Sequence, residues 1–176
     1  AGSNGLQQIE RDIDAMLSHD YEKLLRYVQS SLLFKRDFIE KDEFDRGERV
    51  LLNFAHTFGH SFETVSNYVL PHGSAVALGM MTANHISMQR GFISEEYAMR
   101  IAAVCRKILI HAEVQPVWFS LQDILPAIRK DKKQTSKEIT AVLIAKDHLL
   151  QVFHDIKELE IEKALASMVR FCEERK

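Results

Sequence analysis

Glycine and proline are scarce in this chain, which has seven glycines and three prolines among its 176 residues. Because these two residues mark most turns and helix breaks, their scarcity favours long helices joined by few turns. Cysteine is scarce as well, and the two that occur, Cys105 and Cys172, lie far apart in the sequence. Two thiols without a short spacing predict neither a disulfide framework nor a zinc ribbon, and they favour a reducing, cytoplasmic location.

Long apolar runs are missing too. No stretch approaches the roughly 20 apolar residues that a membrane-spanning helix requires, and the N-terminus lacks the apolar centre of a signal peptide. The formal net charge of -2 gives no electrostatic reason to expect a nucleic-acid or membrane partner. We interpret residues 1–5 as a cloning remnant or a disordered tip. We expect residues 6–176 to form a single helical domain, because that length suits one core.

Apolar residues recur at helical spacing along most of the chain. Helices are expected at residues 6–17, about 18–35, 50–68, 75–90, 94–110, 120–130 and 157–174. Ser18, Ser74 and Ser94 stand where a serine can cap a helix. The densely charged residues 37–49 are expected to be a helix end and a loop. Two β-prone runs, 139–144 and 149–153, predict a hairpin. The fold class is therefore mainly α, with many helices and a small late β-hairpin.

The histidines carry most of the chemical information. His56 and His60 are four residues apart, so on a helix they share one face. His72 follows a break at residues 70–73 that can fold the chain back onto that face. Imidazole nitrogen suits Zn²⁺, and a catalytic zinc usually takes three protein ligands and keeps one position open. From the spacing alone, a metal site and a pair of packed helix histidines bonded to backbone are equally good interpretations.

A longer pattern surrounds these histidines. It consists of Lys35, Asp42-Glu43, Asp45, Gly47, Arg49, Asn53, His56-Thr57-Phe58-Gly59-His60, Glu63, His72-Gly73-Ser74-Ala75-Val76, Gly79-Met80 and Asp131-Lys132-Lys133. The pattern resembles the signature of the 3-dehydroquinate synthase family of sugar-phosphate cyclases, in its C-terminal, metal-binding and substrate-binding domain.

The resemblance implies a role for individual side chains. His56 and His72 would ligate Zn²⁺ or another divalent metal, while His60 would assist proton transfer without being a ligand. Lys35 would share in catalysis and in substrate binding. The other substrate-binding residues would be Arg49, Asn53, His60, Lys132 and Lys133. These residue types suit the binding of a sugar phosphate. Arginine can donate two parallel hydrogen bonds to a carboxylate or phosphate, lysine offers a point charge, and asparagine both donates and accepts hydrogen bonds.

The resemblance also implies a reaction. Enzymes of this family are carbon–oxygen lyases of the shikimate pathway, which makes aromatic amino acids. They convert a small-molecule sugar phosphate, 3-deoxy-D-arabino-heptulosonate 7-phosphate, to 3-dehydroquinate with release of phosphate. NAD⁺ and zinc take part, the zinc as a Lewis acid. The resemblance further implies a cytoplasmic enzyme and a homodimer.

Two parts of the family pattern do not occur in this chain. No Gly-x-Gly-x-x-Gly follows a predicted strand, so NAD⁺ would bind mainly to an N-terminal domain absent here. The family's third zinc ligand, a glutamate, belongs well upstream of Lys35. We therefore expect the chain to be inactive by itself.

Four substitutions depart from the family pattern. Asp45 replaces the usual Glu, Ala55 replaces Gly, Ser61 replaces Ala and Ser74 replaces Glu. Because Ser74 loosens the substrate assignment, a cyclase with a different cyclitol product is an alternative, as is a non-catalytic helical module that keeps the histidines as structure. The retained His60 argues against the valiolone-synthase branch, whose pattern lacks it.

Other conspicuous residues have plain interpretations. Met80, Met81, Met88 and Met99 fall at helical spacing and are expected in the core. His85 is expected to be a partly exposed helix histidine, and Trp118 with Phe119 a packing anchor.

Overall fold

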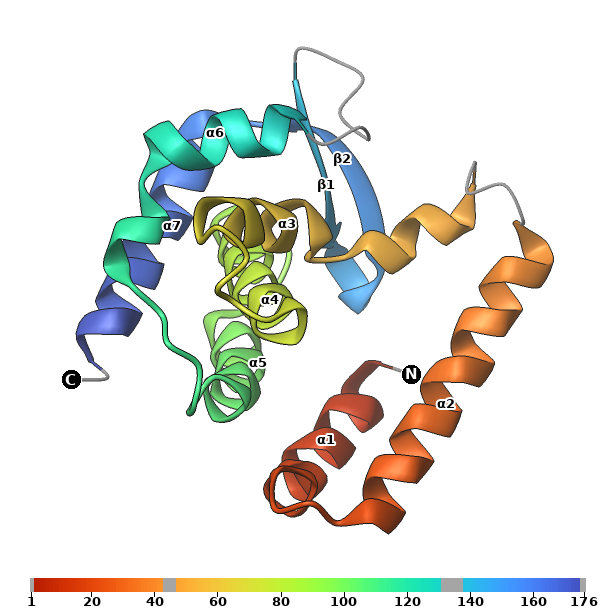
Figure 1. Cartoon of the computed structure of the whole chain (residues 1–176). Helices are drawn as coiled ribbons and strands as arrows, with labels where there is room; N and C mark the ends of the chain where they lie inside the picture. Colours follow the sequence, from red (N-terminus) through yellow and green to blue (C-terminus); the bar gives the residue numbers. More distant parts are fainter. Residues whose placement is uncertain (1, 43–46, 131–137, 175–176) are drawn as a thin grey trace. The chain divides into compact units, whose positions relative to one another are not determined.

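The computed structural model describes residues 2–42, 47–130 and 138–174, without the side chains of residues 2–4. It divides into two compact units, residues 1–53 and 54–176, and each is described by itself. In the described residues, helices dominate and one two-stranded antiparallel sheet is present (Figure 1). This confirms the expected fold class.

The first unit begins with a helical hairpin. Helix α1 spans Gly2–Leu17 and so includes residues 2–5, where the sequence suggested a tip. Helix α2 spans Tyr21–Lys41, and its N-cap is Asp20, whose side chain accepts a hydrogen bond from the backbone N–H of Lys23. Ser18 was therefore the wrong cap, because the chain makes a further turn through His19, at φ 65°, before α2 starts. A short 3₁₀ helix, η1 (Glu48–Asn53), ends the unit.

The second unit is built around α4 (His72–Gln89). This helix packs against α3 (His56–Val65), α5 (Glu95–Ile108), α7 (Glu158–Glu173) and strand β1 (Figure 1). Because it is covered on several sides, ten of its 18 residues are buried. The largest fully buried side chains of the unit come from most of its elements and include Phe58, Phe62, Leu78, Ile86, Ile124, Leu143 and Leu165.

The hairpin and the last helices close this core. Strands β1 (Ile139–Ile144) and β2 (Leu150–Ile156) pair antiparallel through the turn η3 (Lys146–His148), as predicted. Helix η2 (Pro116–Phe119) buries Trp118 and Phe119, which confirms the packing anchor, and α6 (Leu121–Lys130) follows it. Ser94 caps α5 by accepting from the backbone N–H of Tyr97, again as predicted.

Three expectations were wrong in detail. The helix expected over residues 50–68 is broken, because Ala55 adopts a left-handed backbone (φ 69°) between η1 and α3. Helix α4 starts at His72, directly after Pro71, so Ser74 lies in its first turn and does not cap it. Pro71 occupies the N-cap position with an extended backbone, so the helix starts there without a capping serine side chain. Met99 is 64% exposed, whereas Met81 is in the core as expected.

Candidate metal centre

Helix α3 presents a row of metal-binding side chains. His56, His60 and Glu63 stand at positions i, i+4 and i+7, which share one helix face. The chain then turns through residues 66–71. In this turn the Ser66 hydroxyl donates to the Glu63 carbonyl, and its oxygen accepts from the N–H of Leu70. The turn starts α4 beside the end of α3, and His72 is its first residue.

Two glycines let α3 and α4 run close together. A Cβ on Gly79 would collide with the carbonyl oxygen of Ala55 and would lie 2.9 Å from the nitrogen of Gly59. A Cβ on Gly59 would lie 3.3 Å from the carbonyl oxygen of Ala75. The two helices are therefore in near backbone contact. This close approach is what brings the histidine of α4 within reach of those of α3.

The three histidine rings gather into one cluster. Ring centroids lie 5.4 Å apart for His56 and His60, 5.6 Å for His56 and His72, and 6.2 Å for His60 and His72. His56 and His60 are partly buried, and His72 is exposed. The structure therefore brings together all three histidines that the sequence singled out.

Two of these rings are held in a defined orientation through Nδ1. The Nδ1 of His56 lies 2.9 Å from the carbonyl oxygen of Phe54, and the Nδ1 of His72 lies 3.0 Å from Oε1 of Glu63. Both partners are acceptors, so in each neutral ring Nδ1 carries the proton and Nε2 is the basic nitrogen. Metal-ligating histidines typically donate their second N–H to a carbonyl or carboxylate in this way.

Glu63 was part of the sequence pattern, but it was assigned no role. Its side chain is only 14% exposed, and one donor atom each from His60, Glu63 and His72 lie within 4.8 Å of one another. These three residues are thus a second possible ligand set. This set contains His60 in the place of His56, which the family resemblance names as a ligand. The spacing of seven residues from His56 was the signal that could have revealed Glu63.

The donor set fits a divalent metal such as zinc. Imidazole nitrogens with a nearby carboxylate are what Zn²⁺ prefers, and the exposure of His72 leaves one side open.

Three of the substrate-binding candidates lie in the first unit. Lys35 is an exposed residue of α2, while Arg49 and Asn53 are half-buried in η1. The Oδ2 of Asp42 accepts from the backbone N–H groups of Gly47 (2.7 Å) and Arg49 (3.1 Å). Asp42 therefore ties the end of α2 to the start of η1 and fixes the backbone of Arg49. Lys35, Arg49 and Asn53 thus belong to a different unit from the histidines. Lys132 and Lys133 lie outside the described residues.

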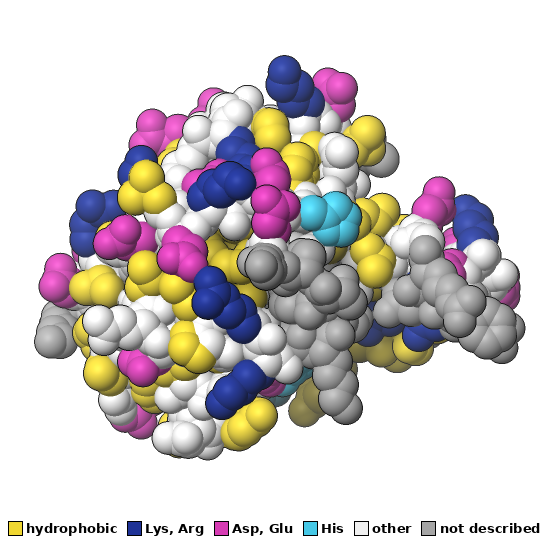
Figure 2. All heavy atoms as spheres, turned by 90° about the horizontal axis from the view of Figure 1, so that it is seen from above, with side chains coloured by type: hydrophobic (Ala, Val, Ile, Leu, Met, Phe, Trp, Pro, Cys, Tyr) yellow, Lys and Arg dark blue, Asp and Glu magenta, His cyan; other side chains and the backbone are white. Residues whose placement is uncertain are grey.

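Acidic and basic side chains are interspersed on the face shown in Figure 2, in line with the net charge of -2. Within the described part of the chain, no helix is both long enough and apolar enough to span a bilayer.

Comparison with known proteins places this site in a family. The family of 3-dehydroquinate synthase C-terminal domains matches residues 1–134. A 3-dehydroquinate synthase from Dictyoglomus turgidum is 33% identical over 158 residues, which are 89% of this chain and 44% of that protein. A bifunctional 3-dehydroquinate synthase/phosphatase from Fusobacterium nucleatum is 32% identical over 91% of this chain and 24% of that protein. The chain thus spans less than half the length of these relatives.

A solved structure shows a similar fold. The 2-epi-5-epi-valiolone synthase of Streptomyces hygroscopicus, solved with NAD⁺ and Zn²⁺ bound, superposes with a TM-score of 0.77 at 19% identity. The match covers 96% of this chain and 47% of that one. This structural match shows the fold, and the family match over residues 1–134 shows the class, a 3-dehydroquinate synthase C-terminal domain. The chain therefore belongs to the 3-dehydroquinate synthase family.

Proposed function

We propose that this chain is the metal-binding and substrate-binding part of a 3-dehydroquinate synthase, a phosphate-eliminating carbon–oxygen lyase. Its substrate would be 3-deoxy-D-arabino-heptulosonate 7-phosphate, and NAD⁺ would bind mainly to a domain outside this chain. The observation that carries the proposal is the cluster of His56, His60 and His72 in a chain of this family. Such an enzyme would be cytoplasmic and homodimeric, as the family resemblance implies.

The roles of the side chains follow from their chemistry and place. His56 and His72 would bind the metal through Nε2, since their Nδ1 atoms are held by Phe54 and Glu63. When bound, zinc supplies Lewis acidity to hydroxyl groups of the substrate. His60, on the same helix face, would take and return protons there. Lys35, Arg49, Asn53, Lys132 and Lys133 would hold the carboxylate, hydroxyl and phosphate groups.

The test is turnover by the whole enzyme, meaning this chain joined to an NAD-binding domain. We expect NAD⁺-dependent phosphate release from the seven-carbon sugar phosphate, and none from residues 1–176 alone. His60→Ala should lower the rate by about 10²–10⁴-fold, as for a lost acid–base group, while zinc content stays at one per chain. His56→Ala should abolish both zinc and turnover.

Two results would contradict these roles. Zinc loss in His60→Ala as complete as in His56→Ala would make His60 a ligand. Stoichiometric zinc in a His56→Ala, His72→Ala double variant would remove the metal assignment altogether.

One residue favours a second candidate, a cyclase with another cyclitol product. Ser74 occupies the first turn of α4, two residues after His72, where the family pattern has a glutamate. A shorter, neutral side chain in place of a carboxylate loosens the substrate assignment. Mass spectrometry of the product formed from several sugar phosphates distinguishes the two candidates.

A further inference from the structure

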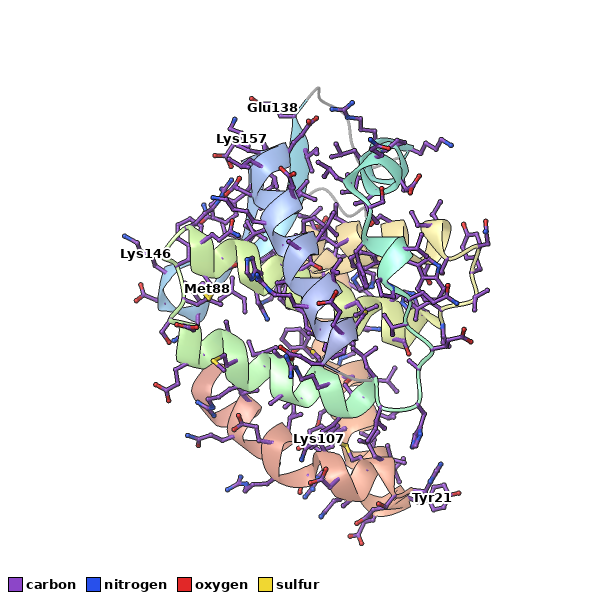
Figure 3. The ribbon with its side chains drawn as sticks, turned by 90° about the vertical axis from the view of Figure 1, so that its left-hand side faces the viewer. Tyr21, Met88, Lys107, Glu138, Lys146 and Lys157 are labelled. Atoms are coloured by element: carbon purple, nitrogen blue, oxygen red, sulfur yellow. The ribbon has the colours of Figure 1, made fainter. Side chains whose placement is uncertain are left out.

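A groove that the proposed function does not use lies between α4, α5 and α7 in the second unit; Figure 3 shows these helices with Met88 labelled. Its volume is about 260 Å³. Four of the chain's six methionines line it, namely Met81, Met88, Met99 and Met168. Methionine is flexible and its sulfur contacts aromatic rings favourably, so this lining suits a flat apolar ligand.

The floor of the groove holds a polar side chain without a partner. Asn84 is 2% exposed, and within the described structure neither its amide nitrogen nor its amide oxygen makes a hydrogen bond. An unsatisfied buried polar group costs about 1–3 kcal/mol, so this amide is unfavourable as it stands. A partner that both donates and accepts would remove that cost.

Asn84 can be reached from the groove. It lies on the same face of α4 as Met81 and Met88, three residues before and four residues after it. Helical side chains lean toward the preceding turn, which directs Met88 toward Asn84. Because methionine has three rotatable bonds, we infer that a ligand can displace Met88 and reach the amide.

The groove is electrically neutral inside and charged at its rim. The pKa of His85 is lowered by its burial and, secondarily, by Arg170, so this imidazole is uncharged at pH 7. Arg106 donates to Glu174 at 3.0 Å and lies 5.3 Å from the ring centre of Phe171. Glu95 also faces the groove. The charged residues that line the groove are two of each sign, Glu95, Glu174, Arg106 and Arg170. Because these charges balance, the groove favours a neutral ligand.

We propose that this groove binds a small neutral aromatic carboxamide. The ring lies against the methionine side chains, and the primary amide donates to Oδ1 and accepts from Nδ2 of Asn84. Pockets for drug-sized ligands usually hold about 300–1,000 Å³, so this smaller groove takes a ligand of about one ring. The site is independent of the histidine cluster and of the proposed lyase activity.

Benzamide is the probe for this site, and the methionine methyl groups report its position by NMR. In the 176-residue chain, benzamide should shift the methyl signals of Met81, Met88, Met99 and Met168. Met16 and Met80 do not line the groove and serve as internal controls. Absence of any shift up to the solubility limit, or shifts confined to Met16 and Met80, would overturn the proposal.

Asn84→Leu is the decisive variant, because leucine keeps the branched side-chain skeleton and removes the unpaired amide. It should weaken benzamide binding at least about 10-fold, because the ligand amide is then left unpaired. Toluene, which lacks the amide, should bind wild type and variant alike. Equal benzamide affinity in both proteins would show adhesion to an apolar surface only. That result would overturn the proposal.

Discussion

At the scale of single residues, the cluster depends on what holds each imidazole. His56 is oriented by the backbone carbonyl of Phe54, which needs no particular side chain, whereas His72 is oriented by the side-chain carboxylate of Glu63. Glu63 is only 14% exposed, so it keeps a fixed position while it faces an exposed histidine. We therefore assign Glu63 to the orientation of His72, and not to the metal itself.

Glu63→Gln tests this assignment. Loss of the carboxylate weakens the orientation of His72, and changes of this kind typically cost 10–100-fold in metal affinity. In the whole enzyme we expect zinc affinity to fall by about that factor, measured by competition with a chromophoric chelator. His111→Gln, at an exposed histidine outside the cluster, should leave the affinity unchanged. A loss as complete as that of His56→Ala would make Glu63 a ligand.

At the scale of elements, the α3–α4 pair decides where the histidines meet. Its close approach requires glycine at position 79, where any side chain would enter the backbone of α3. The left-handed backbone at Ala55 starts α3 at His56. The family pattern has glycine there, and alanine retains this conformation at a cost of about 1–2 kcal/mol.

Gly79→Ala should separate the two helices. Overpacking of this kind costs about 1–3 kcal/mol, so we expect a lower urea midpoint for the 176-residue chain. Gly73→Ala is the matched control on the same helix, since no atom lies within 4 Å of its added methyl group. That control should be neutral or stabilising by up to about 1 kcal/mol. Equal stability of the two variants would mean that the helices do not approach as closely as described.

A second link between elements is the Arg90 clamp. At the end of α4, Arg90 donates to both carboxylate oxygens of Glu160 (2.6 and 2.8 Å) and to Asp155 of β2. Hydrogen bonds from Arg90 lower the pKa of Glu160 and of Asp155. A carboxyl group with a lowered pKa stabilises the fold above its ordinary pKa, and the effect is lost as the pH falls.

Glu160→Gln should therefore reduce the free energy of unfolding at pH 7 by about 1.5–3 kcal/mol, the range for hydrogen bonds to charged groups. It should also flatten the loss of stability as the pH falls from about 5 towards 3. Glu158→Gln, which breaks the exposed pair with Arg129, should cost under about 1 kcal/mol. Denaturant titrations at several pH values measure the free energy of unfolding of both variants. Equal effects of the two substitutions would contradict the stabilising role of the Arg90–Glu160 pair.

The elements show what the sequence could and could not predict. The hairpin, the Ser94 cap and the final helix followed from β-prone runs, capping chemistry and periodicity, which are local properties. The break at Ala55 was missed because alanine is a good helix former and rarely adopts the left-handed backbone found here. Met99 was misplaced because helical spacing does not say which face is covered.

At the scale of the whole molecule, the sequence predicted the family and the histidine cluster. The family followed from a pattern spread over many residues, and it was confirmed by the match over residues 1–134. The roles of Lys35, Arg49 and Asn53 depend on tertiary arrangement between two units, so they stay predictions. The chain spans less than half the length of its relatives, and its activity is accordingly proposed for the whole enzyme.

We propose that His56 and His72 hold the metal through Nε2. Anomalous diffraction at the zinc edge tests it directly, in crystals of the 176-residue chain soaked with zinc at high concentration, because two protein ligands alone bind weakly. We predict one peak within about 2.0–2.1 Å of Nε2 of both His56 and His72, with Nδ1 of each ring still held by Phe54 and Glu63. A peak bound by His60, Glu63 and His72 without His56 would contradict the account.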